Sequence, residues 1–387
     1  MHYIRLLRPP VIEAGRSQVT LKIVLTITTD LGDSFLSPRE PVQLAVIGAY
    51  TEQKDGKDQL IPINLTQAGN NTPKWTAGMR VLKIDLALPT RQPVKTIQVR
   101  PSSPHLTALS TSDICLGKQG LVMAAYADLT PRVEGGGDGD AAAPSVCFRS
   151  LRLPVPNQAL QVEEDIGESI ARHIWDAGIA MVSLIAELCF ESTAELPNLH
   201  GILLPQDRPL NILELGCGVG VLGIGMARIL SIGQPRSATH ILMTDLPEAE
   251  ERARANMARQ GDAAVQLDFE ALDWEDAKHG AFGDKVQSRA WDLVVLSDCT
   301  YNADMLPPLA KTLSAIHSHS ARQSANAEEP VKTEILLATK PRHSSEKIFL
   351  DLMSADGWFI REQTVLPLPV LDGDEQSVEV YLFGMKG

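Results

Sequence analysis

Glycines and acidic side chains follow a series of short apolar runs in the C-terminal half of the chain, where they could form one ligand site. In Leu210–Gly220 (LNILELGCGVG), an apolar run leads through Glu214 into a glycine-rich turn. Apolar runs of this length are typical of buried strands. Glycines permit the unusual backbone angles and the close ligand approach that a nucleotide-binding turn needs. The glycines of the turn are Gly216, Gly218 and Gly220.

Three further acids, Asp245, Asp273 and Asp298, follow later apolar runs. Ligands of open α/β sheets bind outside the carboxyl ends of the strands, so we expect these side chains to face the glycine turn. Asp245 comes 25 residues after Gly220. It suits a ribose diol, because a carboxylate accepts two hydroxyl hydrogen bonds. Asp273 suits an exocyclic amine, and the indole of Trp274 suits the face of a base.

Four motifs together resemble the class I, seven-strand S-adenosylmethionine-dependent methyltransferases, and within them methyltransferase family 16, the protein-lysine methyltransferases. The motifs are the turn Glu214–Gly220, Asp298–Tyr301 (DCTY, an Asp-x-x-Tyr signature), Ile174–Ala177 (IWDA, a Trp-Asp-Ala element) and Leu272–Trp274 (LDW). The resemblance covers about residues 165–387 and leaves the N-terminal part outside.

The resemblance implies that S-adenosyl-L-methionine is the cofactor. It implies that the cofactor is bound by Trp175, Glu214, Gly216, Gly218, Gly220, Asp245, Asp273, Trp274 and Ser297. Three of these residues have a structural alternative. Trp175 could pack in the core, Trp274 could fill a loop, and Asp245 could cap the helix that follows it.

The resemblance further implies N-methylation of a lysine side chain in a protein, with Asp298 and Tyr301 as the catalytic residues. A lysine amine is protonated at neutral pH, and removing its proton there costs about 4.5 kcal/mol. Asp298 would orient the ammonium or accept its proton, and Tyr301 would align the lone pair. Cys299 and Thr300 replace the Pro-Pro pair of enzymes that methylate nucleobase amines and glutamine amides, so these targets are disfavoured.

The elements that position these residues alternate between strand and helix patterns from about residue 165. This alternation predicts a Rossmann-like, doubly wound α/β sheet of seven strands. The expected strands are 212–215, 241–244, 265–268, 293–297, 335–339, 358–365 and 378–383, and the expected helices are 166–190, 219–230, 248–259, 305–317 and 345–355. The last two strands have only a short connection, which requires one antiparallel strand.

The N-terminal 130 residues are β-rich, with expected strands at 18–29, 42–50, 81–88, 96–100 and 121–129. Short strands at such spacing predict a small sandwich- or barrel-like module (1–130). Residues 131–144 are rich in Gly, Ala and Asp, and a flexible linker is expected over residues 131–160. The methyltransferase domain is then expected at 161–387, with a flexible insertion at 318–332.

Composition narrows the partners and the compartment. The net charge of −13 and the lack of a long Lys/Arg run disfavour nucleic acid as a partner. Five cysteines without a Cys-x-x-Cys pair suit a reducing compartment and disfavour a metal site. The longest apolar stretch, Ala177–Phe190, is too short to span a bilayer. We therefore expect a cytoplasmic protein, with the nucleus as a second location, and no membrane partner.

The resemblance implies a protein substrate similar to a translation elongation factor or a chaperone, and an acidic enzyme suits a basic partner. Three other functions stay open. They are N-methylation of a small, nicotinamide-type amine, cofactor binding without catalysis, and NAD-dependent oxidation. The last is disfavoured because the glycines follow a Gly-x-Gly-x-Gly pattern, although Gly223 partly restores the dinucleotide-binding spacing.

Overall fold

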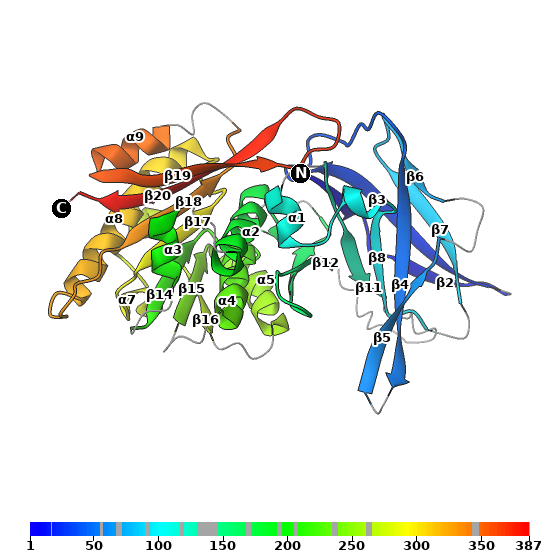
Figure 1. Ribbon diagram of the computed structural model, residues 1–387, viewed down its shortest axis with the longest axis horizontal. Helices are drawn as coiled ribbons and strands as arrows, with labels where there is room; N and C mark the ends of the chain where they lie inside the picture. The colour runs from blue at the N-terminus through cyan, green and yellow to red at the C-terminus, as the bar shows by residue number, and fades with distance from the viewer. Residues whose placement is uncertain are drawn as a thin grey trace.

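The computed structural model describes residues 1–16, 18–54, 57–66, 72–89, 93–116, 120–129, 146–167, 172–191, 196–204, 208–233, 239–260, 265–342 and 348–386. Figure 1 shows an α/β part built around one sheet, beside a β-rich part that contains the N-terminal strands. The chain begins where the two parts meet, close to helix α2 (Asp176–Phe190).

The α/β part holds a seven-stranded sheet in the order β16-β15-β14-β17-β18-β20-β19. Its strands are β14 (Leu210–Leu215), β15 (Thr239–Asp245), β16 (Gln266–Ala271), β17 (Leu293–Ser297), β18 (Glu334–Thr339), β19 (Trp358–Leu368) and β20 (Gln376–Met385). The neighbours from β16 to β18 pair in parallel, whereas β20 runs antiparallel to both β18 and β19. The predicted doubly wound sheet with one antiparallel strand is confirmed.

Helices cover both faces of this sheet because buried side chains alternate along each strand. Ile212, Val295 and Leu336 belong to one apolar cluster with α2, whereas Leu213, Val294 and Ile335 belong to a second cluster on the opposite face. The first face carries α2, α3 (Pro197–Leu203), α4 (Val221–Gly233) and α5 (Pro247–Arg259). The second carries α6 (Trp274–Ala277), α7 (Asp284–Gln287), α8 (Leu306–Gln323) and α9 (Ile348–Ala355). The short 3-10 helix η3 (Ala303–Met305) leads into α8.

The β-rich part consists of two sheets that share one apolar cluster, as a sandwich does. The first sheet contains β1 (His2–Leu6), β2 (Val11–Ala14), β3 (Val19–Thr29), β7 (Leu82–Leu88), β9 (Thr107–Ala108) and β10 (Val122–Met123). The second contains β4 (Val42–Lys54), β5 (Lys57–Asn64), β6 (Lys74–Trp75), β8 (Thr96–Pro101), β11 (Ala125–Asp128), β12 (Val146–Arg152) and β13 (Ala159–Asp165). Helices η1 (Pro104–Leu106) and α1 (Thr111–Leu116) connect strands of this part.

The predicted flexible linker at 131–160 is wrong over its second half. Residues 131–145 lie outside the described residues, but β12 and β13 pair antiparallel along their whole lengths. The Gly-, Ala- and Asp-rich stretch ends at Pro144, before this hairpin begins, and the hairpin buries two charged side chains as a pair. The Arg149 guanidinium donates to Glu164 Oε1 (Nε–Oε1 2.8 Å), and both side chains are almost fully buried.

The predicted helix at 166–190 begins ten residues late, at Asp176, so Trp175 precedes the helix and does not lie on it. The Ile174 N–H donates to Glu164 Oε2 (3.2 Å), which fixes the chain in a non-helical conformation there. The expected flexible insertion at 318–332 is also wrong at its start, because α8 continues to Gln323. Ser320 Oγ accepts the Trp291 N–H (2.9 Å), which ties this last part of the helix to the sheet.

Candidate active site

The carboxyl ends of β14, β15 and β17 open into a cavity of about 730 Å³, a volume typical of a small-molecule site. Nine of the predicted site residues line it: Trp175, Gly216, Gly218, Asp245, Asp273, Trp274, Ser297, Asp298 and Tyr301. The structure therefore brings together five segments of the chain that are far apart in sequence. Glu214 and Gly220 are not among the described residues that line this cavity.

The glycine turn has the backbone geometry that its sequence predicts. Gly216, Gly218 and Gly220 have φ angles of 65°, 53° and 82°, in the left-handed region that side chains disfavour. A Cβ on Gly216 would lie 2.5 Å from the Sγ of Cys299 and 3.4 Å from Trp274. The absence of that Cβ keeps the wall of the cavity open at this point.

Glu214 lies beneath the turn, where it supports the loop from inside. Its side chain is buried, and Oε2 accepts the N–H of Gly223 at the start of α4 (3.0 Å). Burial raises the pKa of Glu214 well above its usual range, the nearby Asp245 adds to the effect, and the bond from Gly223 opposes it. A Cβ on Gly223 would lie 2.4 Å from the same oxygen, so this glycine admits the buried carboxyl group.

Asp245 joins the turn to the end of β15. One oxygen accepts the Gly218 N–H and the other accepts the Leu246 N–H, both at 2.7 Å. Burial raises its pKa, and the two amide bonds oppose that effect. The helix-capping alternative is not observed, because α5 begins at Pro247 after Leu246 and has no side-chain cap. The carboxylate instead faces the cavity beside the turn, as a ribose-binding acid would.

The two tryptophans line the cavity from different elements. Trp175 stands at the first position before α2, with the guanidinium carbon of Arg342 5.4 Å from its ring centroid. Trp274 is the first residue of α6, and its carbonyl accepts from Thr312 Oγ1 (3.2 Å). Asp273 caps α6 through the Glu275 N–H (2.9 Å), so this acid has a structural role as well as a place at the cavity.

Asp298 is the most constrained acid of the cavity. It follows β17 with a φ of 52°, and its side chain is only 7% exposed. Its Oδ2 accepts the Ala177 N–H (2.9 Å) and its Oδ1 accepts the Lys340 N–H (3.1 Å). Burial raises the pKa of Asp298 to about 6, with Arg342 and the amide bonds opposing and Asp30 adding to the rise. The group is therefore ionised at neutral pH.

Tyr301 lies three residues further on, at the rim, where 58% of the residue is exposed. The exposed Leu246 and the acid Glu248 lie on the same cavity lining. The Asp-x-x-Tyr motif thus places a buried carboxylate inside the cavity and a phenol at its mouth.

Sequence analysis missed His173, Gly178 and Glu248, which also line the cavity. Gly178 had a usable signal, because it directly follows the Trp-Asp-Ala element and glycine is unfavourable inside a helix. A Cβ there would lie 2.7 Å from Val221 and 3.3 Å from Ser297 Oγ. His173 had no local signal, since its place depends on the fold; its Nε2 lies 2.7 Å from the Gly167 carbonyl oxygen.

The charge of the cavity distinguishes between ligand classes. Its lining includes five carboxylates, and no Lys or Arg is among the described residues that line it; the carboxylates are Asp245, Glu248, Asp273, Asp298 and Glu275. A pyrophosphate would meet repulsion from these groups, whereas a ligand with hydroxyls and positive charge would be attracted. The residues present fit a sulfonium nucleoside and do not fit NAD.

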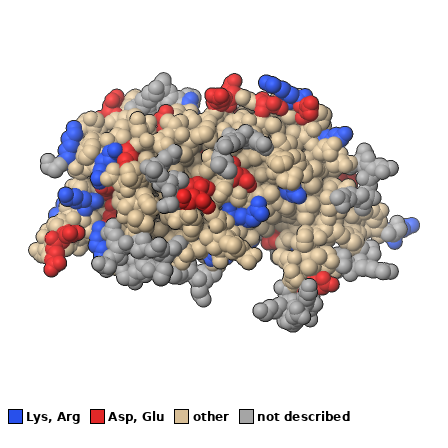
Figure 2. Space-filling model, in the orientation of Figure 1, with Lys and Arg blue, Asp and Glu red and all other residues tan. Residues whose placement is uncertain are grey.

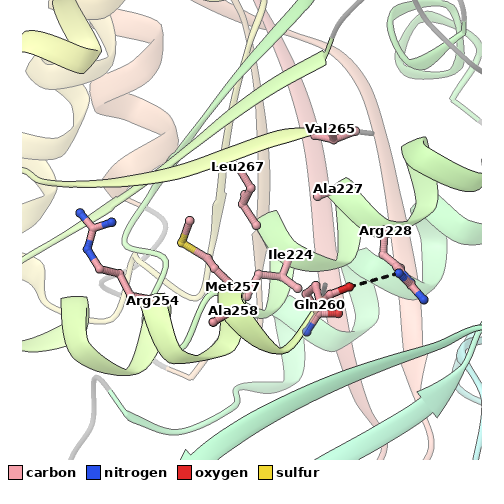
Figure 3. A pocket seen from close by; sticks show the side chains of 9 residues that line it. All are labelled: Ile224, Ala227, Arg228, Arg254, Met257, Ala258, Gln260, Val265 and Leu267. Carbon is pink, nitrogen blue, oxygen red and sulfur yellow. Dashed lines mark hydrogen bonds between the residues drawn. The ribbon is translucent and has the colours of Figure 1, made fainter. Parts of the chain in front are cut away.

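A second hollow of about 370 Å³ lies away from this site, between α4, α5 and β16 (Figure 3). Ile224, Met257 and Leu267 contribute apolar side chains, and Arg228 lies at one end with its guanidinium near the Gln260 carbonyl oxygen (3.5 Å). None of the predicted site residues lies there, so the candidate active site is the larger cavity.

Residues 154–356, just over half of the chain, match the family described as "Lysine methyltransferase". The chain belongs to the lysine methyltransferase family. It is therefore an S-adenosylmethionine-dependent methyltransferase, and S-adenosylmethionine is its cofactor. The matched residues include the whole glycine turn and the Asp-x-x-Tyr motif, both of which contribute residues to the cavity.

Among proteins similar to this methyltransferase is the UPF0665 family protein C23C4.06c of Schizosaccharomyces pombe, which is 24% identical over 90% of this chain and 91% of its own. Two solved structures are also similar. A SAM-dependent methyltransferase of Methanosarcina mazei is 15% identical over 49% of this chain and 98% of its own, with a TM-score of 0.32. A SAM-dependent methyltransferase of Clostridium acetobutylicum is 10% identical over 54% of this chain and 98% of its own, also with a TM-score of 0.32.

Proposed function

We propose that this methyltransferase transfers a methyl group from S-adenosylmethionine to the side-chain amine of a lysine in a protein substrate. One observation carries the proposal: Asp298 and Tyr301, the ends of the Asp-x-x-Tyr motif, line the same cavity as the glycine turn. The family's description, "Lysine methyltransferase", supports the same conclusion. In this proposal Gly216, Gly218, Asp245 and Trp274 hold the cofactor.

The bound cofactor supplies an electrophilic methyl group. The chain's own residues then have to bring an amine in line with it and remove the amine's charge. Positioning accounts for much of such a rate increase. The buried Asp298 carboxylate is ionised at neutral pH, so it attracts the incoming ammonium and orients it.

Asp298 is a weak base for removing the proton of the substrate ammonium. Its pKa of about 6 is far below that of an unperturbed lysine, about 10.4. The carboxylate therefore binds the ammonium better than it deprotonates it. Tyr301 at the mouth is placed to accept or donate a hydrogen bond to the amine where solvent water can take up the proton. We assign orientation to Asp298 and alignment of the lone pair to Tyr301.

A protein is favoured as the substrate because the catalytic motif ends at an exposed rim, which a lysine side chain of a folded partner can reach. The five carboxylates of the cavity suit a basic segment. On the face seen in Figure 2, described Lys and Arg side chains are interspersed with Asp and Glu and form no continuous band for a phosphate backbone. Elongation factors and chaperones are the proposed substrate types.

We propose that the protein is cytoplasmic and also nuclear. None of the five cysteines, all of which the structure describes, forms a disulfide, which suits the cytoplasm or nucleus. None of the described helices is both long and apolar enough to cross a membrane.

The test is incubation of the full chain with methyl-labelled S-adenosylmethionine and whole-cell extract, separated beforehand into a protein fraction and a small-molecule fraction. We expect label on the protein fraction. Label on small amines alone would favour the nicotinamide-type alternative. Cofactor binding with no label in either fraction would favour a binding module without catalysis.

A further inference from the structure

A buried cluster of charges links the β-rich part to the active site. It consists of Asp30 directly after β3, Asp176 at the start of α2, Asp298 after β17, and Lys340 and Arg342 after β18. Asp30 and Asp176 have fully buried side chains, and those of the two cations are 9% and 16% exposed. Asp30 is the member of this cluster that comes from the β-rich part.

Asp30 contacts both cations. Lys340 Nζ lies 2.9 Å from Asp30 Oδ1 and 2.7 Å from Asp176 Oδ2, so it connects two carboxylates. Arg342 directs both of its terminal nitrogens at Asp30, with Nη2–Oδ2 at 2.9 Å and Nη1–Oδ1 at 3.4 Å. These contacts outweigh burial and hold the pKa of Asp30 well below its usual range.

The guanidinium of Arg342 interacts much more weakly with Asp298 than with Asp30. Arg342 Nη2 lies 3.8 Å from Asp298 Oδ2, beyond hydrogen-bond distance, whereas it is 2.9 Å from Asp30. Asp298 instead accepts two neutral amide hydrogen bonds. Were Arg342 to turn its fork to Asp298, the two would form a bidentate ion pair, and a substrate ammonium would have to displace it.

We propose that Asp30 is a positioning residue that holds Arg342 away from Asp298 and so keeps the Asp298 carboxylate available to the cation entering the cavity. The proposal rests on the role given to Asp298 under the proposed function. It also gives the β-rich part a task in the reaction, because that part supplies the counter-ion.

Other charged or titratable groups face this cluster and are kept constant in the test. They are the α-amino group of Met1, which contacts Asp176 (2.7 Å), Tyr3, whose hydroxyl donates to Asp176 (2.6 Å), His2, Arg5, whose guanidinium donates to the Asp30 carbonyl, and Cys299 and Tyr301. Burial and the neighbouring amine lower the pKa of His2 to about 4, so it stays neutral between pH 5 and 8.

The experiment follows the ionisation of Asp298 itself. The full chain is labelled with carboxyl-¹³C aspartate, the Asp298 signal is assigned as the one missing in Asp298→Asn, and its titration midpoint is measured. We expect a midpoint near pH 6 in the native chain. In Asp30→Asn a negative charge is lost and Arg342 approaches Asp298, and both changes favour the ionised form. The midpoint should then fall by about one pH unit or more.

Glu163→Gln is the matched control. Glu163 lies on β13 and pairs with Arg252 and Arg259 of α5, so it too joins the β-rich part to the α/β part, but it does not line the cavity. In Glu163→Gln the titration midpoint of Asp298 should stay near pH 6. An unchanged midpoint in Asp30→Asn, or an equal change in Glu163→Gln, would overturn the proposal.

Arg342→Gln extends the test. Loss of the Arg342 cation should raise the titration midpoint of Asp298 above pH 6. When Asp30→Asn is added to Arg342→Gln, the midpoint should fall by less than half as much as it does when Asp30→Asn is made in the native chain. This arm also serves if Asp30→Asn alone does not fold, and a midpoint that fails to rise would contradict the proposal. The activity of Asp298→Asn reports separately on the proposed function, since the titration requires no methyl acceptor.

Discussion

At the scale of single residues, Asp298 differs from the base that its motif first suggests. It accepts two backbone hydrogen bonds, and it adopts a left-handed conformation with a φ of 52°. Strained, buried acids of this kind are typical of functional sites. Its pKa of about 6 makes it a binding group for an ammonium at neutral pH rather than a strong proton acceptor.

Tyr301 is the second residue on which the mechanism depends. Tyr301→Phe removes one hydrogen bond to the reacting amine, which is worth about 1.5–3 kcal/mol for a charged partner. We expect kcat for the methyl acceptor to fall about 10- to 100-fold, with the affinity for S-adenosylhomocysteine unchanged.

Tyr50→Phe provides the control for this substitution. Tyr50 is a partly buried tyrosine of β4 that does not line the cavity. Loss of the Tyr50 hydroxyl should leave both kcat and the affinity for S-adenosylhomocysteine unchanged. If Tyr301→Phe were as active as the native chain in steady-state assays, alignment of the amine would have to come from another group.

At the scale of elements, the glycine turn between β14 and α4 is the part of the site that the sequence specifies most fully. Gly216→Ala would force a side chain into a left-handed position at a cost of about 1–2 kcal/mol. It would also place a Cβ 2.5 Å from Cys299 Sγ. We expect S-adenosylhomocysteine binding, measured by calorimetry, to weaken by more than tenfold.

Gly280→Ala separates strain from loss of the site. Gly280 has a φ of 80°, and a Cβ there would have no atom within 4 Å. Gly280→Ala should lose stability in denaturant unfolding from backbone strain alone, Gly216→Ala should lose at least as much, and only Gly216→Ala should lose cofactor affinity. Equal affinities in the two variants would show that the turn does not contact the cofactor.

The elements also show why sequence analysis succeeded in one part and failed in another. The strands of the α/β sheet could be predicted because buried parallel strands are short, continuous apolar runs. The start of α2 could not be predicted, because Ile166, Ile170 and Ile174 have the spacing of a helix. The Ile174 amide instead donates a hydrogen bond to Glu164, ten residues earlier in the chain. The hairpin β12–β13 was missed because the predicted linker was extended past the Gly-, Ala- and Asp-rich stretch, which ends at Pro144, into a segment whose residues pair in strands.

At the scale of the whole molecule, the two parts form one continuous structure around the site. Tyr3 and Leu160 of the β-rich part belong to the same apolar cluster as α2. Asp30 and Lys340 lie 310 positions apart in the chain, yet their side chains are in contact. No local pattern predicts such a pair, so the sequence predicts much of the cavity lining but not the charges that surround Asp298.

We propose that this molecule methylates lysine in a protein, with Asp298 orienting the amine. The direct measurement uses methyl-labelled S-adenosylmethionine and an extract protein fraction, followed by complete hydrolysis and identification of the labelled amino acid. We predict labelled methyllysine with the native chain, and at least tenfold less with Asp298→Asn at unchanged S-adenosylhomocysteine affinity. Label in another amino acid, or equal methyllysine from the native chain and Asp298→Asn, would contradict the account.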